Sequence, residues 1–207
     1  MLNEIRGKWF KRIAQTISYL PHFLSWIVLA GVFQQLLSPS TGVVNKLLNA
    51  IGVESIYFLG DAQWARFTMV VTDLWKGVGW GTIIYLAAIT SIDAEQYEAA
   101  VLDGAGKFQQ MIYITIPNMM FVITFQLIMS TGNLMNSSFD QIYNMGNDAT
   151  SKVLNTLGVL THNKGIVEMD YSFSAAAGLW QNLVSFVLII ITNAISKKFS
   201  DGEFSIW

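Results

Sequence analysis

Hydrophobic and polar positions divide the chain into long apolar segments separated by polar stretches. The apolar segments cover about residues 17–37, 67–88, 118–138 and 175–195, and the third gains its last turn from residues 135–138. A helix of about 20 residues can cross a hydrocarbon core of about 30 Å. The pattern therefore predicts an all-α, polytopic transmembrane helical bundle. It contains about four spanning helices within a single domain over residues 1–207.

Two of the polar stretches predict short helices outside the spans. They are the stretch between the first and second spans and the stretch between the third and fourth. Val43, Leu47 and Ile51 share one face of a helix expected over residues 43–51, as in a helix that lies at a membrane interface. A second helix is expected near residues 151–160, in a stretch rich in Asn and Asp. Long ordered loops are often binding surfaces, and a simple connector is equally consistent with this pattern.

Composition agrees with a membrane protein and excludes several other classes. The chain is 53% hydrophobic and only 13% charged, and its net charge of −2 provides no basic face for nucleic acid. Without cysteine, and with only His22 and His162, it is expected to hold no metal ion. The phosphate-binding motif Gly-x4-Gly-Lys-[Ser/Thr] does not occur, because the stretch at Gly106-Lys107 lacks its first glycine and its hydroxyl residue. Neither a Gly-x-Ser-x-Gly nor a His-Glu-x-x-His motif occurs, so no catalytic residue is expected.

The stretch between the second and third spans, residues 91–117, predicts a helix, a turn and another short helix. Asp93 and Gln96 have the spacing of a capping box, and Gly104 and Gly106 end the first helix. A second helix is expected from Lys107 to Ile114, with Pro117 in the first turn of the next one. The small residues allow another protein to approach closely, and the carboxylates can pair with its basic side chains. The small residues are Ala99, Ala100 and Gly104, and the carboxylates belong to Glu95, Glu98 and Asp103.

The spacing in this stretch resembles a known frame. Glu98-Ala99-Ala100, then Gly104, Ile114 and Ile116-Pro117, match the "EAA" loop of binding-protein-dependent ABC importer permeases in every spacing, with Ile116 replacing leucine. We call residues 91–117 the coupling loop. The resemblance implies that it couples this chain to an ATPase subunit through Glu98, Ala99, Ala100, Asp103, Gly104, Ile114 and Pro117. An ordinary amphipathic cytosolic loop is the alternative.

Further motifs are similar to the oligosaccharide or polysaccharide branch of these permeases. They are Tyr19-Leu20-Pro21, Asp73-Leu74-Trp75-Lys76 and Gly79-Trp80-Gly81. The resemblance implies a sugar or oligosaccharide solute, a second permease subunit, an extracellular solute-binding protein, and ABC ATPase subunits that bind ATP and Mg, with no cofactor on this chain. It also implies the cytoplasmic (inner) membrane of a prokaryote. Such permeases usually have about six crossings, so an N-terminal truncation or a companion chain is expected.

Basic residues predict the orientation. With the coupling loop in the cytoplasm, most lysines and arginines lie inside and both termini are cytoplasmic. The inside set is Arg6, Lys8, Lys11, Arg12, Lys107, Lys197 and Lys198, and the outside set is Lys46, Arg66, Lys152 and Lys164.

Polar residues within the spans are candidates for a solute pathway. Asp73 and Lys76, three positions apart, form either a structural ion pair or a contact with solute. Gln126, Ser130 and Asn133 form a stripe on one helical face, and Gln181 belongs to a weaker stripe. Each stripe can bind sugar hydroxyls or a neighbouring helix.

Two glycines in the second predicted span indicate a close contact with another helix. Gly77 and Gly81 have a spacing that permits close helix packing.

Three alternative functions remain open from the sequence. They are a permease for a non-sugar solute, a truncated membrane protein that does not transport, and, least favoured, a membrane enzyme.

Overall fold

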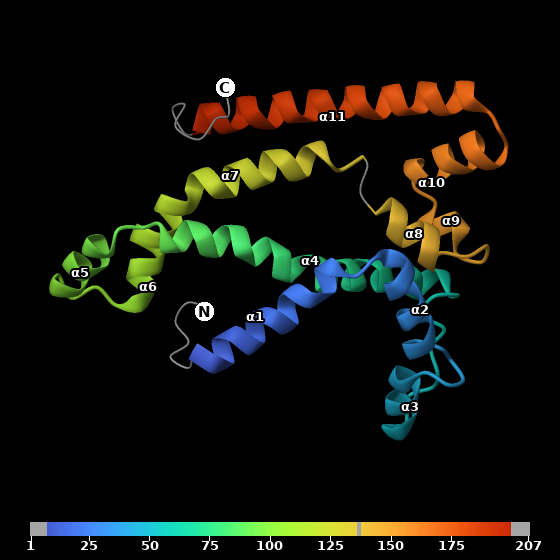
Figure 1. The fold of residues 1–207 in the computed structure, drawn as a ribbon, viewed down its shortest axis with the longest axis horizontal. Coiled ribbons are helices and arrows are strands. Elements are labelled where there is room, and N and C mark those ends of the chain that lie inside the picture. Colours follow the sequence, from blue (N-terminus) through green and yellow to red (C-terminus); the bar gives the residue numbers. More distant parts are fainter. Residues whose placement is uncertain (1–7, 136–137, 200–207) are drawn as a thin grey trace. The chain divides into compact units, whose positions relative to one another are not determined.

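The structure, a computed structural model, describes residues 8–135 and 138–199, and every regular element in these ranges is a helix. The all-α prediction is therefore confirmed (Figure 1). In chain order the elements are α1 (Lys8–Phe23), α2 (Trp26–Leu36), α3 (Val43–Ala50), α4 (Ala62–Thr90), α5 (Ala94–Leu102), α6 (Lys107–Gln110), the π-helix η2 (Met111–Thr115), α7 (Ile116–Gly132), α8 (Phe139–Met145), α9 (Ser151–Leu154), α10 (Leu157–His162), the π-helix η3 (Asn163–Val167) and α11 (Tyr171–Phe199). The expected helices near residues 43–51 and 151–160 correspond to α3 and to α9 with α10.

Two helical stretches in the described ranges are long and apolar enough to cross a membrane alone, Lys107–Gly132 and Tyr171–Lys198. Two further spans result if each of two bent pairs counts as one. Arg12–Phe23 meets Trp26–Leu36 at 106°, and Ala62–Thr90 meets Ala94–Leu102 at 68°. The prediction of about four spans is therefore reached only when the bent pairs are included.

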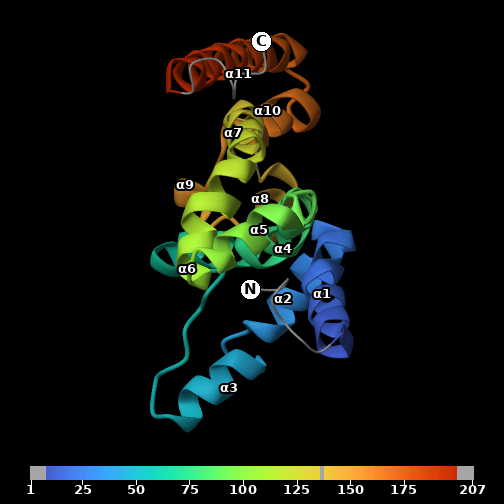
Figure 2. The same ribbon diagram turned by 90° about the vertical axis from the view of Figure 1, so that its left-hand side faces the viewer.

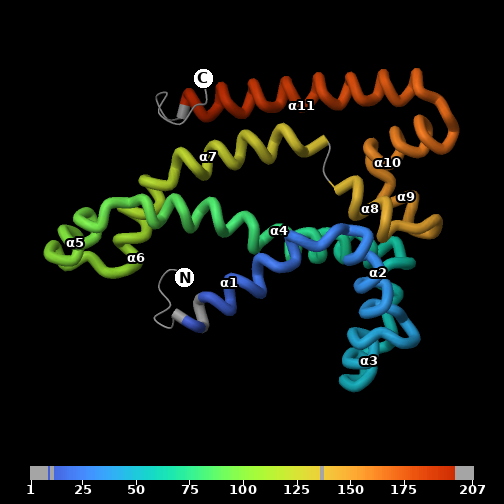
Figure 3. The backbone as a smooth tube through the Cα atoms, in the orientation of Figure 1, coloured from blue at the N-terminus to red at the C-terminus, as the bar shows by residue number. Residues whose placement is uncertain are grey.

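The first predicted span, residues 17–37, does not form one continuous helix. Helix α1 ends at Phe23 just after Pro21, and α2 begins at Trp26. Ser25 adopts an extended conformation (φ −68°, ψ 152°), and its side chain accepts a hydrogen bond from the Val28 amide as the N-cap of α2. The backbone turns sharply at this point (Figure 3). A proline near a helix end followed by a serine cap explains the break.

The third predicted span, residues 118–138, is extended at the opposite end from the one expected. Helix α7 ends at Gly132, but the helical backbone continues toward the N-terminus through η2 and α6 to Lys107. Pro117 lies in the first turn of α7, as predicted. A π-helix has hydrogen bonds between residues five positions apart instead of four. The π-helical turn η2 precedes Pro117, which has no amide hydrogen, and the helix continues through it. Residues 136–137 of the expected C-terminal extension lie outside the described ranges.

The chain divides into two compact units, and each is described separately. The first, which we call the core unit, comprises residues 8–79 and 138–181 of the described chain. In it α2 packs against α8, and buried apolar side chains form one cluster. These are Ala30, Leu59, Ala65, Met69, Met145 and Leu154.

Asn45 on α3 connects this helix to its surroundings in the core unit. It is only 1% exposed, and its Nδ2 atom donates to the carbonyls of Leu37, Ser38 and Ile56. Its Oδ1 atom accepts from the Ile56 amide at 2.8 Å. Figure 2 shows the extended segment that leads from α3 toward α4, and Ile56 lies in this segment.

Close helix packing in the core unit occurs at Gly79 rather than at the expected glycines. A Cβ atom at Gly79 would overlap the backbone carbonyl of Ser18 on α1. At Gly77 and Gly81 an added Cβ would meet no atom within 4 Å in the described part of the chain. Gly79 is therefore the position at which α1 and α4 require glycine.

The second unit, which we call the coupling-loop unit, comprises residues 80–135 and 182–199 of the described chain. It contains the end of α4, helices α5 to α7 and most of α11. At Gly132 an added Cβ would lie 2.6 Å from Ile189 Cδ1, so α7 and α11 are close at this position.

Candidate functional site

The first half of the coupling loop is a well-defined short helix. Asp93 is the N-cap of α5, and its carboxylate accepts a hydrogen bond from the Glu95 amide at 3.0 Å. Gly104 follows the helix with φ +78°, a conformation that favours glycine. The cap and the stop are as predicted. Gln96, however, does not complete a capping box, because its Oε1 atom accepts a hydrogen bond from Asn118 on α7.

Two contacts connect α5 to η2 and to the start of α7, and a third orders the turn between α5 and α6. The Tyr97 and Thr115 hydroxyls lie 2.9 Å apart, and Gln96 and Asn118 form the bond described above. In the turn, the Gly106 amide donates to Gln109 Oε1 at 2.8 Å. The loop is thus a folded helix–turn–helix, and its second helix continues directly into α7.

Most of the predicted coupling residues lie on the surface. Glu98, Ala99, Asp103, Gly104 and Pro117 are exposed, whereas Ala100 and Ile114 are half-buried. No residue of α5 is buried. The arrangement leaves carboxylates and small residues accessible to another protein.

The sequence interpretation missed the apolar surface of the same loop. Leu102 is 89% exposed and Phe108 is 69% exposed, on either side of the Gly104 turn. Large apolar side chains exposed to this extent are typical of a surface that another protein covers. The sequence did contain a signal for this surface. Val101 and Leu102 are adjacent apolar residues in a short helix outside the predicted spans.

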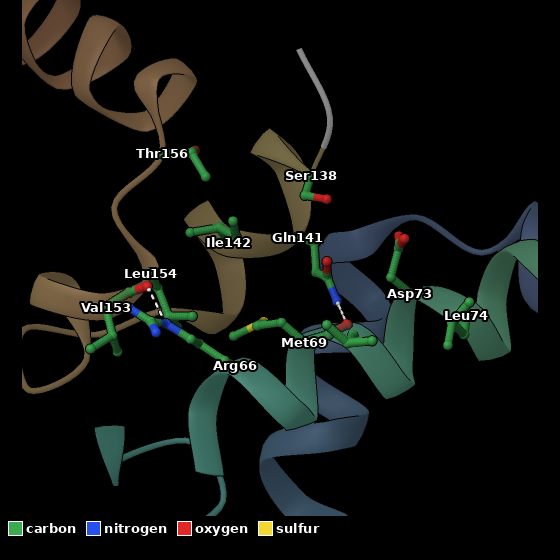
Figure 4. A pocket seen from close by; sticks show the side chains of 11 residues that line it. Arg66, Met69, Asp73, Leu74, Ser138, Gln141, Ile142, Val153, Leu154 and Thr156 are labelled. Carbon is green, nitrogen blue, oxygen red and sulfur yellow. Dashed lines mark hydrogen bonds between the residues drawn. The ribbon is translucent and has the colours of Figure 1, made fainter. Parts of the chain in front are cut away.

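A cavity of about 400 Å³ lies in the core unit. Figure 4 shows its polar lining, with Arg66 and Asp73 on α4 and Gln141 on α8. The remaining lining residues are Met69, Val70, Leu74, Ser138, Ile142, Val153, Leu154 and Thr156. The cavity is mostly apolar with a few convergent polar groups, as small-molecule sites usually are.

Two polar residues in this cavity have defined roles in its structure. Gln141 is 1% exposed, and its amide nitrogen donates to the Met69 carbonyl and to Thr72 Oγ1, each at 2.8 Å. Arg66 Nε donates to the Val153 carbonyl at 3.3 Å. These bonds connect α4 to α8 and α9. Gln141 was not among the predicted site residues, since its sequence position in a polar loop resembles that of an exposed residue.

The structure does not pair Asp73 with Lys76. No salt bridge joins them in the described chain, and Lys76 does not line the cavity. Its ammonium group instead donates to the carbonyls of His22 and Leu24 at 2.8 Å and of Pro21 at 3.4 Å, and lies 5.6 Å from the Trp26 ring centre. The structural ion pair, one of the two alternatives for these residues, is therefore not formed. Lys76 stabilises the break between α1 and α2, and Asp73 alone of the pair faces the cavity.

The polar stripe on α7 bonds largely to its own helix. Ser130 Oγ donates to the Leu127 carbonyl at 2.9 Å, and Asn133 Nδ2 donates to the Met129 carbonyl at 3.2 Å. Both residues are exposed, and Gln126 is half-buried. Gln181 on α11 is 6% exposed and lines a second cavity. None of these four residues lines the cavity that contains Asp73.

An all-helical chain with up to four candidate spans and an exposed helix–turn–helix in the Glu-Ala-Ala frame belongs to the class of polytopic membrane proteins. Residues 1–201 match the family described as "Binding-protein-dependent transport system inner membrane component". The chain therefore belongs to this family.

Several known proteins are similar to the chain. It is 41% identical to Protein LplB of Bacillus subtilis over 96% of this chain and 63% of that protein. It is 36% identical to the polygalacturonan/rhamnogalacturonan transport system permease protein YteP of the same organism, over 97% of this chain and 63% of that protein. The chain thus spans less than two thirds of the length of both relatives.

A solved structure shows the same fold. A bacterial alginate ABC transporter, in complex with an alginate pentasaccharide-bound periplasmic protein, contains a chain that superposes with a TM-score of 0.94 at 33% identity. The match covers 100% of this chain and 71% of the chain in that structure.

Proposed function

We propose that the chain is a membrane-spanning subunit of an ATP-driven importer that moves a sugar or oligosaccharide across the cytoplasmic membrane of a prokaryote. The observation that carries this proposal is the coupling loop. It combines the Glu-Ala-Ala frame, in which Ile116 replaces the leucine, with a folded helix–turn–helix whose carboxylates and large apolar side chains are exposed. Such a surface fits a partner protein, and the frame identifies that partner as an ABC ATPase subunit.

The proposal includes partners and an orientation. Two ATPase subunits bind ATP and Mg, a second permease subunit completes the pathway, and an extracellular solute-binding protein delivers solute. The basic residues at both ends of the described chain favour a cytoplasmic coupling loop and cytoplasmic termini. The chain itself performs no catalysis in this scheme. Closure of the ATPase pair moves the coupling loop and switches the pathway between inward and outward access.

A sugar is the solute class best supported. One relative is a polygalacturonan/rhamnogalacturonan transport permease, and the similar structure is an alginate transporter. In this chain, the cavity that contains Asp73 joins a carboxylate, a buried amide and a guanidinium with apolar walls. A carboxylate accepts hydrogen bonds from hydroxyl groups, and an amide both donates to them and accepts from them. We include Asp73 in the solute pathway, and Gln126, Ser130, Asn133 and Gln181 as further candidates.

Exchange of charge in the coupling loop tests the proposal. In the assembled importer in lipid nanodiscs, Glu98→Lys should abolish the ATP hydrolysis that the solute-loaded binding protein stimulates, because it places a cation against the basic residues of the ATPase. Glu54→Lys makes the same change at another exposed glutamate, outside the coupling loop, and should leave stimulation intact. Normal stimulation in Glu98→Lys would reject the coupling role. Failure of any sugar to stimulate the unaltered importer would reject the sugar assignment.

A further inference from the structure

A second cavity, of about 390 Å³, lies in the core unit and shares no lining residue with the first. Its walls come from α8, α10, η3 and the start of α11. The lining residues are Phe139, Gly158, Thr161, His162, Gly165, Ile166, Tyr171, Ser174 and Gln181. Its volume lies within the usual range for small-ligand sites.

One wall of this cavity is aromatic. The Phe139 ring in this wall stacks on Tyr143, which lies behind the lining, with ring centres 5.4 Å apart and an interplanar angle of 23°. The His162 ring lies 5.3 Å from Phe139 and 4.8 Å from Tyr143. Tyr171, another lining residue, is 65% exposed. Aromatic faces combine apolar area with fixed geometry, which suits the C–H face of a pyranose ring.

Hydrogen-bonding groups lie in the same walls. Gln181 is 6% exposed, and its carboxamide contains both donor and acceptor atoms. Ser174 Oγ donates to the Thr161 carbonyl at 2.7 Å and retains acceptor capacity. In the described chain, Thr161 Oγ1 and His162 Nδ1 are buried without a hydrogen-bond partner. Atoms without accessible surface cannot meet a ligand in the cavity, so the lining groups offered to sugar hydroxyls are those of Ser174 and Gln181.

The lining also limits the charge of the occupant. It contains no aspartate, glutamate, lysine or arginine. The carboxylate of an acidic sugar would lose its hydration there without gaining a cation, and burial of an unpaired charge is strongly unfavourable. The chemistry therefore favours a neutral sugar ring.

We propose that this second cavity is a subsite for one neutral pyranose ring of the transported solute, separate from the cavity that contains Asp73. The inference rests on the proposed function. Apart from Gln181 in the fourth predicted span, the lining residues lie in the segment between the third and fourth predicted spans, which the proposed orientation places outside the cell, where solute arrives.

Gly158 provides a direct way to fill the cavity. A Cβ atom there would meet only Phe139, at 3.7 Å, which is an ordinary contact distance. Gly158→Ala should therefore be tolerated, whereas Gly158→Trp should place a large ring in the cavity. Tyr171→Ala removes an exposed aromatic side chain from the lining, and Tyr57→Ala removes one that is 55% exposed elsewhere in the core unit.

The test is equilibrium binding of labelled pentasaccharides to the assembled importer in nanodiscs, without binding protein. The neutral probes are maltopentaose, xylopentaose and mannopentaose, and the acidic probe is alginate pentasaccharide. Gly158→Trp should abolish binding of the preferred neutral probe, and Gly158→Ala should preserve it. Tyr171→Ala should weaken it about three- to tenfold, as loss of one aromatic contact predicts, and Tyr57→Ala should leave it unchanged.

The outcomes separate the two proposals. Sugar uptake with unaltered binding in Gly158→Trp and Tyr171→Ala would overturn the subsite and leave the proposed function standing. Absence of uptake of every sugar by the unaltered importer with its binding protein would reject both. Weaker docking of the binding protein with unchanged sugar binding would show that a protein segment occupies the cavity, and would also overturn the subsite. If Gly158→Trp reduces assembly, Tyr171→Ala decides.

Discussion

In the core unit, Asn45 and Gln141 are each 1% exposed, and their amides bond to backbone carbonyls of neighbouring segments. In the coupling loop, the acidic side chains of Glu98 and Asp103 are exposed, and no residue of α5 is buried. Polar side chains thus stabilise tertiary structure in the first region and remain accessible for recognition in the second. We expect substitutions in the core unit to change stability and substitutions in the coupling loop to change coupling.

The largest expected effect is an all-or-none difference in chemical labelling of the two regions. The chain has no cysteine, so a single introduced thiol reports its own accessibility. Glu95→Cys in the coupling loop should resist a membrane-impermeant maleimide in intact cells, whereas Asp148→Cys, an exposed position between α8 and α9, should react. Permeabilised cells provide the control, in which both thiols should react. The reverse pattern would overturn the proposed orientation.

The next effect is a loss of stability at the crossing of α1 and α4. The Cβ atom of Gly79→Leu overlaps the backbone of Ser18, whereas the Cβ atom of Gly77→Leu, on the same helix, meets no atom within 4 Å in the described chain. Overpacking usually costs about 1–3 kcal/mol, and a backbone clash reaches the upper end of that range. The midpoint of thermal unfolding of the purified assembly should fall for Gly79→Leu only. Equal midpoints for the two variants would exclude a tight crossing at Gly79.

A smaller effect is expected at Asn45. Asn45→Ala leaves the carbonyls of Leu37, Ser38 and Ile56 without their side-chain donor, and an unsatisfied buried group costs about 1–3 kcal/mol. Asn49→Ala, one helical turn away, removes only an exposed bond to Ser55 and should cost less than about 0.5 kcal/mol. Thermal unfolding measures both. Solute-stimulated ATP hydrolysis per folded importer should be unchanged in both, and a selective loss in Asn45→Ala would contradict the division of roles.

These positions show which parts of the structure the sequence could predict. Apolar segments and motif spacing predicted the helical class, the N-cap at Asp93 and the turn at Gly104, because these depend on residues close together in the chain. The sequence did not predict the partners of Lys76 and Gln141, because these depend on segments that are distant in the chain. Asp73 and Lys76 had the spacing of an ion pair, but three backbone carbonyls at the end of α1 satisfy the ammonium group instead.

The smallest effect is expected at the ion pair of Lys164 and Glu168. Lys164 Nζ donates to Glu168 Oε2 at 2.6 Å, and the two side chains are 40% and 55% exposed. This hydrogen bond, together with the charge of Glu168, raises the pKa of Lys164 above its ordinary value. A raised pKa in the folded state contributes stability that is complete below the pKa of the unfolded state and disappears as pH rises through the folded value. The stability is therefore lost in the alkaline range, above the usual lysine pKa of about 10.4.

At neutral pH both side chains of the pair are charged, but water and salt screen an exposed pair so strongly that its net contribution to stability is close to zero. Lys164→Met should thus leave the thermal midpoint unchanged at neutral pH, in contrast to Asn45→Ala. A clear drop that disappears at high salt would show that an exposed ion pair contributes to the stability of this unit as the buried amides do.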